Sequence, residues 1–450
     1  MKDGLMNSRI CAYDVRFAKY RKKLLNHDIR RNTMLLSRKT FVKLNENEAN
    51  IIGHLCYAAS KLWNVCNYER IHYKELGLGK YPDWYYQKSH HKDNIWFKSL
   101  PSQTAQEVCK LLDKSWKSFY VLQRTKGVEN PRPPRFKHNG IAVTYMQNGI
   151  KHEGGNEEIR LSLPKNLKEY LKERYQINDN YLFLKNKLFK NIDMIKQLHI
   201  YPPENGKCKV IVVYEIEDVE VQADNGHYLS VDLGLHNLMT CYDSNAKTFI
   251  VGRNYLSICR KYDKEIARVQ SQWSKQQIRN GIQYPKPSKH VLKLYQKKRD
   301  CIKDYLHKIT HSLVEYCIKN EIRTVVVGDI RNVRKGNNLG KKTNQKLHGL
   351  PYDKIYGMLE YKLKLVGIRF VRQEESYTSQ CSPYADMVSK ETAEKSNRKE
   401  RGLYVAKGEV FNADAVGAYN IMRKYFAISG IEKEMSVSGL ANTRILKVAV

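Results

Sequence analysis

The stretch Tyr228–Leu238, YLSVDLGLHNL, decides the fold of the C-terminal half of this 450-residue chain. Its first residues form a short apolar run that carries one carboxylate, Asp232, and breaks at Gly234. Such a run predicts a buried strand that ends at a site. A buried carboxylate is costly unless a positive group such as a metal ion compensates it. Taken alone, Asp232 is either a metal ligand or the cap of a turn.

The composition indicates a polyanionic partner. The chain holds 79 Lys and Arg against 46 Asp and Glu, which gives a formal net charge of +33. Such an excess is typical of nucleic-acid-binding proteins, and some of the 31 tyrosines could stack on unpaired bases. A membrane surface is the rival partner, but no apolar run approaches the ~20 residues of a spanning helix. We therefore expect no membrane association.

The ten cysteines are scattered, with no C-x2-C pair and no Cys/His cluster. This pattern predicts free thiols in a reducing cytosol and no zinc site.

Periodicity divides the chain into four segments. Residues 1–48 combine a basic arm with strand-like alternation near Phe41, and residues 49–139 have helical spacing. Residues 140–225 return to strand-like alternation and indicate a small barrel or sheet, to which the early strand could pair. Residues 226–450 alternate apolar strands with helices, which predicts an α/β sheet.

Two helix starts are visible in the second segment. Asn45 or Asn47 is a suitable cap for its first helix. A second helix opens at Pro101 and Ser102, and the proline-rich NPRPPRFKHNG closes the segment.

Carboxylates of the fourth segment lie where elements end. Asp232 ends the first strand, Glu374 and Glu375 end the strand GIRFVRQEE, and Asp414 opens the last helix behind the cap Asn412. Small residues of that helix, in ADAVGA, would allow close packing on a sheet. Three ionised carboxylates brought together repel each other, and Mg²⁺ is commonly held by carboxylates, water and substrate phosphate. Two such ions about 4 Å apart support phosphodiester hydrolysis, so the residues predict a basic, Mg²⁺-dependent nuclease.

A longer helical stretch, about residues 255–320, carries Lys289, Lys293 and Lys297 on one face. This spacing suits a phosphate backbone, although a solvated helix face has the same pattern.

Taken together, SVDLGLHNL, VVVGDI, EESYTSQCS, RGLY and NADAVGAYNI resemble, in order and spacing, the RuvC nuclease domain of the TnpB family. TnpB proteins are transposon-encoded RNA-guided nucleases and the ancestors of compact type V CRISPR effectors. LPSQTAQEV and NPRPPRF extend the resemblance over nearly the whole chain. It implies a multidomain α/β + α + β protein with a C-terminal RNase H-like domain. It also implies an N-terminal split oligonucleotide-binding-like barrel (the wedge), interrupted by a helical recognition domain.

The resemblance implies a guide RNA, a double-stranded DNA target beside a short adjacent motif, and two Mg²⁺ ions. It leaves the oligomeric state open, with a monomer favoured. The helix that starts at Ser102 would read the adjacent motif, with Gln103 and Gln106 as candidates because amides pair bidentately with adenine.

The chain departs from the family at the middle strand. Most members have a metal-binding Glu where this sequence has Gly328, which is followed by Asp329. The resemblance to an RNase H-like sheet implies that the strand GIRFVRQEE lies beside VVVGDI, so a Glu at its end could reach the same metals. Some members place the Glu there, three residues before a Thr-Ser pair, which selects Glu375 here. Strand alternation puts Glu374 and Glu375 on opposite faces. The metal ligands and catalytic residues are thus predicted to be Asp232, Glu375 and Asp414, with Glu374 and Asp329 in reserve.

The second departure concerns the zinc ribbon that usually precedes the last helix. Only Cys381 lies in the corresponding stretch, about residues 377–411, so a metal-free, degenerate version is expected. Arg401 in RGLY matches a family position near the site and is a reserve catalytic candidate; a plain surface Arg is the alternative.

Three functions stay open on this basis. The leading one is an RNA-guided, Mg²⁺-dependent DNA endonuclease. A nuclease-inactive, RNA-guided DNA-binding repressor shares every basic feature and differs only at the metal site. An unguided, structure-specific nuclease of the RuvC type would carry no specific RNA.

Overall fold

The structure is a computed structural model, and it describes residues 33–330, 349–400 and 402–449. These residues form two compact units that divide between Asp218 and Val219, close to the predicted boundary at 225/226. Each unit is described by itself. The finer division of the first unit into 1–48, 49–139 and 140–225 stays a prediction.

The helices of unit 1 begin where the sequence supplies caps. The Asn45 side chain accepts from the Glu48 backbone N–H and the Glu48 side chain accepts from the Asn45 N–H, a reciprocal capping box. This confirms Asn45 as the cap of the first helix. The helices are α2 (Glu46–Ile71), α3 (Trp84–His90), α4 (Ile95–Lys98), α5 (Ser102–Thr125) and α6 (Lys165–Tyr175).

The strands of unit 1 form two open sheets. The first has the antiparallel order β1 (Thr33–Lys43), β7 (Lys207–Glu217), β6 (Ile195–Ile200), β2 (Val143–Met146). The second joins β3 (Ile150–Lys151), β4 (Glu158–Ser162) and β5 (Tyr181–Lys185). As expected, the strand around Phe41 pairs with a later strand, in register along all of β7. The barrel itself is not closed among the described strands, because β1 and β2 lie at opposite edges of the first sheet and β2 continues through a 3₁₀ turn into the second.

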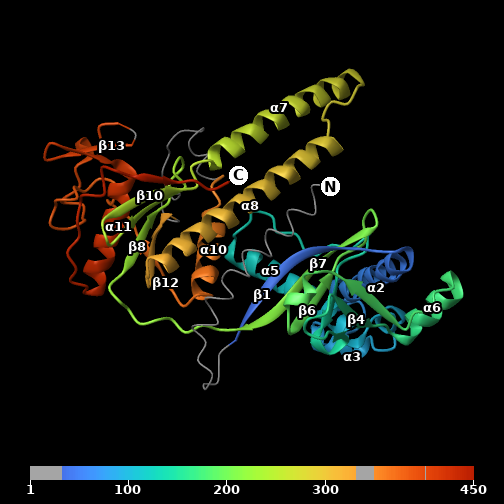
Figure 1. Cartoon of the computed structure of the whole chain (residues 1–450). Helices are drawn as coiled ribbons and strands as arrows, with labels where there is room; N and C mark the ends of the chain where they lie inside the picture. Colours follow the sequence, from blue (N-terminus) through green and yellow to red (C-terminus); the bar gives the residue numbers. More distant parts are fainter. Residues whose placement is uncertain (1–32, 331–348, 401, 450) are drawn as a thin grey trace. The chain divides into compact units, whose positions relative to one another are not determined.

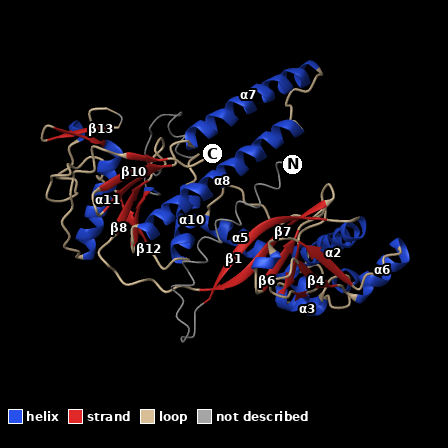
Figure 2. Cartoon of the chain, in the orientation of Figure 1, coloured by secondary structure: helices blue, strands red, loops and turns tan. Residues whose placement is uncertain are grey.

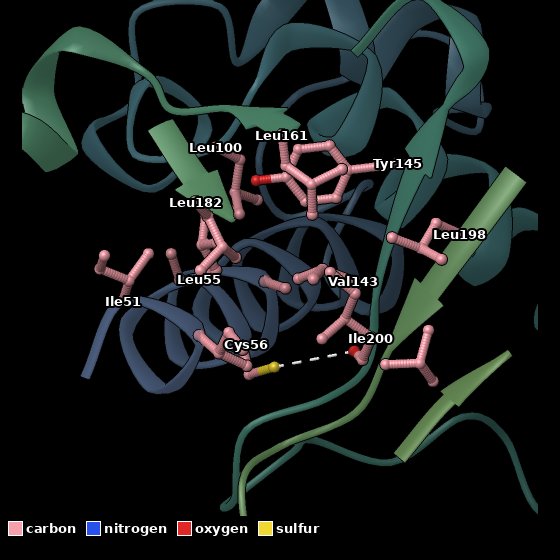
Figure 3. Packing of buried hydrophobic residues seen from close by; sticks show 14 of the residues in the cluster. Ile51, Leu55, Cys56, Leu100, Val143, Tyr145, Leu161, Leu182, Leu198 and Ile200 are labelled. Carbon is pink, nitrogen blue, oxygen red and sulfur yellow. Dashed lines mark hydrogen bonds between the residues drawn. The ribbon is translucent and has the colours of Figure 1, made fainter. Parts of the chain in front are cut away.

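A single apolar core runs from Val42 to Tyr214 and joins the helices of unit 1 to both sheets. Figure 3 shows part of it, with Leu55 and Cys56 of α2 facing Val143 and the buried Tyr145 of β2. Helical and sheet segments therefore share one core, which explains why they cluster as one unit.

Unit 2 is built on a mixed six-stranded sheet in the order β12-β11-β8-β9-β10-β15. Strands β8, β11 and β12 are parallel, and β9 is antiparallel to both β8 and β10. The predicted neighbourhood of VVVGDI and GIRFVRQEE is confirmed by the β11–β12 pairing. The strands are β8 (Tyr228–Asp232), β9 (Met239–Asp243), β10 (Lys247–Val251), β11 (Thr324–Asp329), β12 (Arg369–Glu374) and β15 (Arg444–Leu446).

Helices cover both faces of this sheet (Figures 1 and 2). On one face lies α11 (Ala413–Ser429), where the Ser230 hydroxyl of β8 donates to the Ala418 carbonyl at 2.6 Å. On the other, Tyr316 of α8 (Lys289–Lys319) donates to Asp243 of β9 at 2.7 Å. Alternation along β9, with Tyr242 against Tyr419 of α11 and Asp243 against α8, places successive side chains on opposite faces. The remaining helices are α7 (Tyr255–Arg279) and α10 (Tyr352–Lys364).

The segment before α11 contains the hairpin β13 (Leu403–Ala406) and β14 (Glu409–Asn412). Cys381 is buried there and lies 3.2 Å from the Ser389 carbonyl and 3.5 Å from the Thr392 hydroxyl. Hydrogen bonds and packing hold its surroundings. In the described parts of both units, no helix has the length and apolar character needed to cross a bilayer.

Candidate active site

The carboxyl ends of the three parallel strands of unit 2 meet at one edge of the sheet. Asp232 ends β8, Asp329 ends β11, and Glu374 and Glu375 end and follow β12. This edge is where open α/β sheets bind ligands. It borders a pocket of about 1210 Å³, here named the carboxylate pocket. Its lining includes Asp232, Asp329, Glu374, Glu375, Arg398 and Asp414.

Glu375 enters this pocket through space that Gly328 leaves open. A β-carbon on Gly328 would lie 2.2 Å from Glu375 Oε2, closer than any real contact. In the β8–β11 ladder Val327 pairs with Val231, so Gly328 follows this pair beside Asp232. The side chain from β12 thus reaches over the middle strand, and it can do so because that strand carries no side chain at this point.

Glu374 is held differently from its neighbour. It is exposed, and Lys424 of α11 forms an ion pair with it. The Ser376 backbone N–H also donates to Glu374 Oε1 at 2.6 Å. Burial opposes ionisation of Glu374, but the bonds from Lys424 and Ser376 outweigh it and hold its pKa below the ordinary value. Its charge is therefore compensated within the protein.

Asp414 lies in the first turn of α11, behind Asn412. The Asn412 side chain accepts from the N–H groups of Asp414 and Ala415 at 3.0 and 3.1 Å, which confirms the predicted cap. Asn237, in the connection between β8 and β9, donates to Asp414 Oδ2 at 2.8 Å. Arg398 lies 3.7 Å from Asp414 Oδ1.

Close packing of α11 on the sheet brings Asp414 near Asp232. A β-carbon on Gly417 would lie 2.9 Å from Asp232 Oδ2, so this glycine permits the approach. The predicted role of the small residues in ADAVGA, close packing on a sheet, is confirmed at this contact.

The electrostatics of the pocket show carboxylates that lack compensation. Burial, and then repulsion from Asp414, raise the pKa of Asp232 to about 7, although Arg398 acts in the opposite direction. Burial, and then the charges of Asp232 and Asp329, raise the pKa of Glu375 to about 8. Glu375 Oε2 is buried and accepts no hydrogen bond from any described residue. Such groups favour the binding of a cation.

The structure brings Asp232, Glu375, Asp414, Glu374 and Asp329 to one pocket. Among the described residues, however, no group of three or more His, Cys, Asp or Glu side chains is close enough together to hold a metal ion as it stands. Arg401 lies outside the described residues. Whether these side chains are ligands or catalytic groups stays a prediction.

Sequence reasoning missed Arg398 and Asn237. Asn237 belongs to the opening motif, but its amide could equally have served the turn after β8. Arg398 stands in the polar stretch Lys395–Lys399, with no spacing that connects it to Asp414. Only the folded chain brings these residues together.

The predicted nucleic-acid contacts of unit 1 lie at the start of α5. Ser102 and Gln106 line a second pocket of about 560 Å³, and Gln103 is exposed on the same helix. The pocket, here named the lysine pocket, contains no acidic lining residue. Its lining consists of Lys88, Ser89, Lys92, Phe97, Lys98, Leu100, Ser102 and Gln106. No spacing along the chain would have selected these lysines.

In unit 2, Lys289, Lys293 and Lys297 are all exposed along the first turns of α8. This placement is compatible with both a phosphate contact and a solvated face, so their role also stays a prediction.

Comparison with protein families identifies two segments of the chain. Residues 211–334 match the model OrfB_IS605, described as "Probable transposase". Residues 352–421 match "Cas12f1-like, TNB domain". The second match covers β12, the Cys381 segment and most of α11, and therefore includes Glu375 and Asp414.

Two further proteins are similar over most of the chain. The Escherichia coli (strain K12) protein "Putative RNA-guided DNA endonuclease InsQ" is 23% identical over 372 residues, covering 79% of this chain and 82% of its own. A solved structure, "Cryo-EM structure of the Cas12f1-sgRNA-target DNA complex", has a TM-score of 0.55 at 14% identity. It covers 84% of this chain and 83% of its own and shows a shared fold. Together these matches confirm the resemblance to the TnpB family.

Proposed function

We propose that this TnpB-like chain is an RNA-guided, Mg²⁺-dependent endonuclease that cleaves double-stranded DNA beside a short adjacent motif. The similarity to a relative named as an RNA-guided DNA endonuclease supports the coarse class. The carboxylate pocket supports the nuclease chemistry. The alternative within the same family is a repressor that binds DNA but does not cut it.

One observation carries the proposal: Glu375 projects a buried, unpartnered oxygen into the space above Gly328, beside Asp232. Burying a carboxylate without a partner destabilises the folded state, so replacing a Glu that has no function at this position would not reduce stability. Glu374, one residue earlier, has Lys424 as its partner and needs no cation. The contrast favours Glu375 as the relocated third carboxylate.

The donor groups fit Mg²⁺. They are hard carboxylate oxygens, and both Asp232 and Glu375 have raised pKa values in the absence of a cation. Mg²⁺ accepts a few carboxylates and completes its shell with water and phosphate oxygens. When bound, such ions would supply an activated water and charge stabilisation for phosphodiester hydrolysis. Asp232, Glu375 and Asp414 are the residues that would hold them.

Other side chains of the pocket orient these groups and attract the substrate. Asn237 fixes one oxygen of Asp414, and Arg398 approaches the other. Arg253 and Arg260 contribute positive charge to the wall of the pocket, where a DNA phosphate would enter. Arg398 also partly offsets the negative charge on Asp232 and Asp414.

The positive charge of the chain supports the guide RNA and DNA partners. A net charge of +33 provides backbone affinity that is independent of sequence. Guide pairing would read the target, and the protein would read the adjacent motif. Ser102, Gln103 and Gln106 are proposed for this reading, and Lys289, Lys293 and Lys297 for backbone contacts.

For the test, the chain is expressed from DNA that includes its native flanking sequence, and the RNA that co-purifies with the protein is isolated. Sequencing this RNA is expected to yield one defined species with a guide segment. The complex is then incubated with a plasmid library that carries the matching target next to randomised flanks, with Mg²⁺ or with EDTA. We expect linear products, enriched for one flanking motif, in Mg²⁺ only.

Two results would overturn the proposal. Motif-dependent binding of the plasmid without cutting would assign the chain as a repressor. Cleavage by protein that carries no specific RNA would indicate an unguided nuclease.

A further inference from the structure

Helix α7 carries a row of cations that begins at the carboxylate pocket. Its first turns contribute Leu256, Ser257 and Arg260 to the pocket lining. Starting at Arg260, basic residues recur at helical spacing toward the far end of α7. They are Arg260, Lys264, Arg268, Lys275 and Arg279, here named the cationic stripe.

The cationic stripe occupies a single face. At 100° per residue, its five members fall within an arc of about 100°, and they span about 28 Å along the axis. All five are exposed. The two acids of α7, Asp263 and Glu265, lie outside that arc. Asp263 forms an ion pair with Lys298 of α8, with an N–O distance of 2.5 Å. In the described chain no member of the stripe forms an ion pair.

The opposite face of α7 provides the packing. Ile266 of α7 is buried against Val291 and Leu294 of α8, with Tyr262 and Val269 alongside. These residues lie roughly opposite the stripe on the helix. Figure 1 shows α7 and α8 running together away from the sheet strands β8 and β10. The apolar face thus fixes the helix pair, and the stripe remains exposed along its length.

The outer part of this helix pair is uniformly positive. From Ile266 to Arg299 the chain has nine Lys and Arg and no Asp or Glu. The connection between the helices carries Tyr284, which is 83% exposed. Trp273 of α7 donates to the Lys286 carbonyl at 2.8 Å and so secures this connection to the helix. Exposed aromatic rings beside a positive track are the combination that binds unpaired nucleic acid.

We propose that the cationic stripe is the track along which a single DNA strand runs to or from the carboxylate pocket. Charge complementarity and continuity with the pocket both favour this occupant. A second copy of the chain is disfavoured, because two such arms would repel each other. The assignment of DNA rests on the proposed function, since the strand that is cut must enter the pocket beside Arg260.

The test uses the purified full-length chain and a fluorescein-labelled oligodeoxythymidylate, in EDTA so that no cutting occurs. Arg260 is kept, because it lines the pocket. In the stripe variant, four residues are replaced by Gln: Lys264, Arg268, Lys275 and Arg279. In the control variant, four exposed lysines of unit 2 that lie off the stripe are replaced by Gln: Lys247, Lys303, Lys319 and Lys390.

Anisotropy titrations over a salt series give the slope of log Kobs against log[salt]. Each lost contact to a single-strand phosphate lowers the magnitude of this slope by ~0.7. The slope of the stripe variant is therefore expected to be smaller in magnitude by about 3 than that of the wild type. The control variant carries the same loss of charge and is expected to keep the wild-type slope. Equal slopes for the stripe variant and the wild type would refute the track.

Lysine labelling adds a positional readout. Bound oligodeoxythymidylate is expected to protect Lys264 and Lys275 from reductive methylation and to leave Lys303 and Lys319 reactive. Unchanged reactivity of Lys264 and Lys275 would refute the track. Stronger protection by oligouridylate than by oligodeoxythymidylate would assign the stripe to RNA and overturn the DNA proposal.

The binding assay tests the track and the plasmid assay tests the proposed function, so either hypothesis can be refuted without the other. Guided plasmid cleavage with an unchanged stripe slope would remove the track and leave the proposed function. Loss of slope in the stripe variant of a chain that never cuts would retain the track and remove the nuclease.

Discussion

The carboxylate pocket of unit 2 and the lysine pocket of unit 1 are opposite in charge and also in construction. The acidic side chains come from β8, β11, β12 and α11, which are far apart in sequence. The lysine pocket is lined by residues between Lys88 and Gln106, a single run of short helices and the start of α5. One pocket therefore depends on tertiary packing, and the other on local chain geometry.

Burial makes the second difference. Asp232 and Glu375 are desolvated beside like charges, and their pKa values rise to about 7 and about 8. Lys92 and Lys98 are exposed, so water and salt screen them. Changes in the carboxylate pocket should therefore have large, position-specific effects, and changes in the lysine pocket small and graded ones.

The largest effect is expected from Glu375→Gln. Loss of a ligand oxygen removes several kcal/mol of charge stabilisation, which corresponds to about a thousandfold or more in the rate of plasmid cleavage. Glu374→Gln is the matched control and should stay within about threefold, because its carboxylate already pairs with Lys424. If Glu374→Gln abolished cutting and Glu375→Gln did not, the assignment of the two residues would be reversed.

Gly328→Ala should come next. The added β-carbon would meet Glu375 Oε2 at 2.2 Å and Ile421 Cδ1 at 2.9 Å, and both are ends of flexible side chains. The fold should therefore survive while the Glu375 carboxylate is displaced. Misplacement of about 1 Å costs up to a hundredfold in rate, so we expect a fall in kcat of about tenfold to a hundredfold, with DNA affinity unchanged.

Gly357→Ala is a suitable control for Gly328→Ala, because no atom lies within 4 Å of a β-carbon at that helical position. Wild-type cleavage by Gly328→Ala would mean that Glu375 is not held as the structure places it.

The pH dependence of stability tests the uncompensated charge directly. Asp232 and Glu375 have raised pKa values in the folded state, so between about pH 4 and pH 8 the folded chain binds more protons than the unfolded chain. Metal-free protein should therefore lose stability as pH rises through this window. The expected fall in Tm is about 2–4 °C for each kcal/mol lost, measured by differential scanning fluorimetry.

Mg²⁺ should offset this loss most strongly near pH 8, where the carboxylates ionise in its presence. Glu375→Gln should flatten the pH profile of the metal-free protein. A metal-free Tm that increased steadily from pH 5 to pH 8 would contradict the burial of these carboxylates beside like charges.

The smallest effect is expected in the lysine pocket. Lys92→Gln removes one exposed cation, so the magnitude of the salt slope for duplex DNA binding should fall by ~0.9, with little change in cleavage at low salt. Lys114→Gln, an exposed lysine on α5 that does not line the pocket, should leave the slope unchanged. Equal slopes for both variants would place the duplex elsewhere.

Much of the fold could be predicted because it depends on short-range rules. The strand that ends at Asp232, the Asn45 and Asn412 caps, and the position of Asp414 in a first turn all follow from hydrophobic periodicity and capping. The pairing of β11 with β12 followed from the resemblance to an RNase H-like sheet. For residues 140–225 the sequence left a small barrel and a sheet as alternatives. The described strands form open sheets, because closure depends on which edge strands meet.

By itself, the sequence determined where the elements end and which carboxylates stand at those ends. Only the tertiary structure decided which of these carboxylates lie together in the carboxylate pocket, shielded from water. Glu375 and Gly328 are separated by 47 positions in the sequence, and nothing local connects them. Parallel pairing of β11 and β12 places the Glu375 side chain beside Gly328, which has no side chain. The packing of α11 brings Asp232 within 2.9 Å of the position that a Gly417 β-carbon would occupy. The reason is physical: backbone periodicity is local, whereas steric fit and desolvation depend on every neighbour in space.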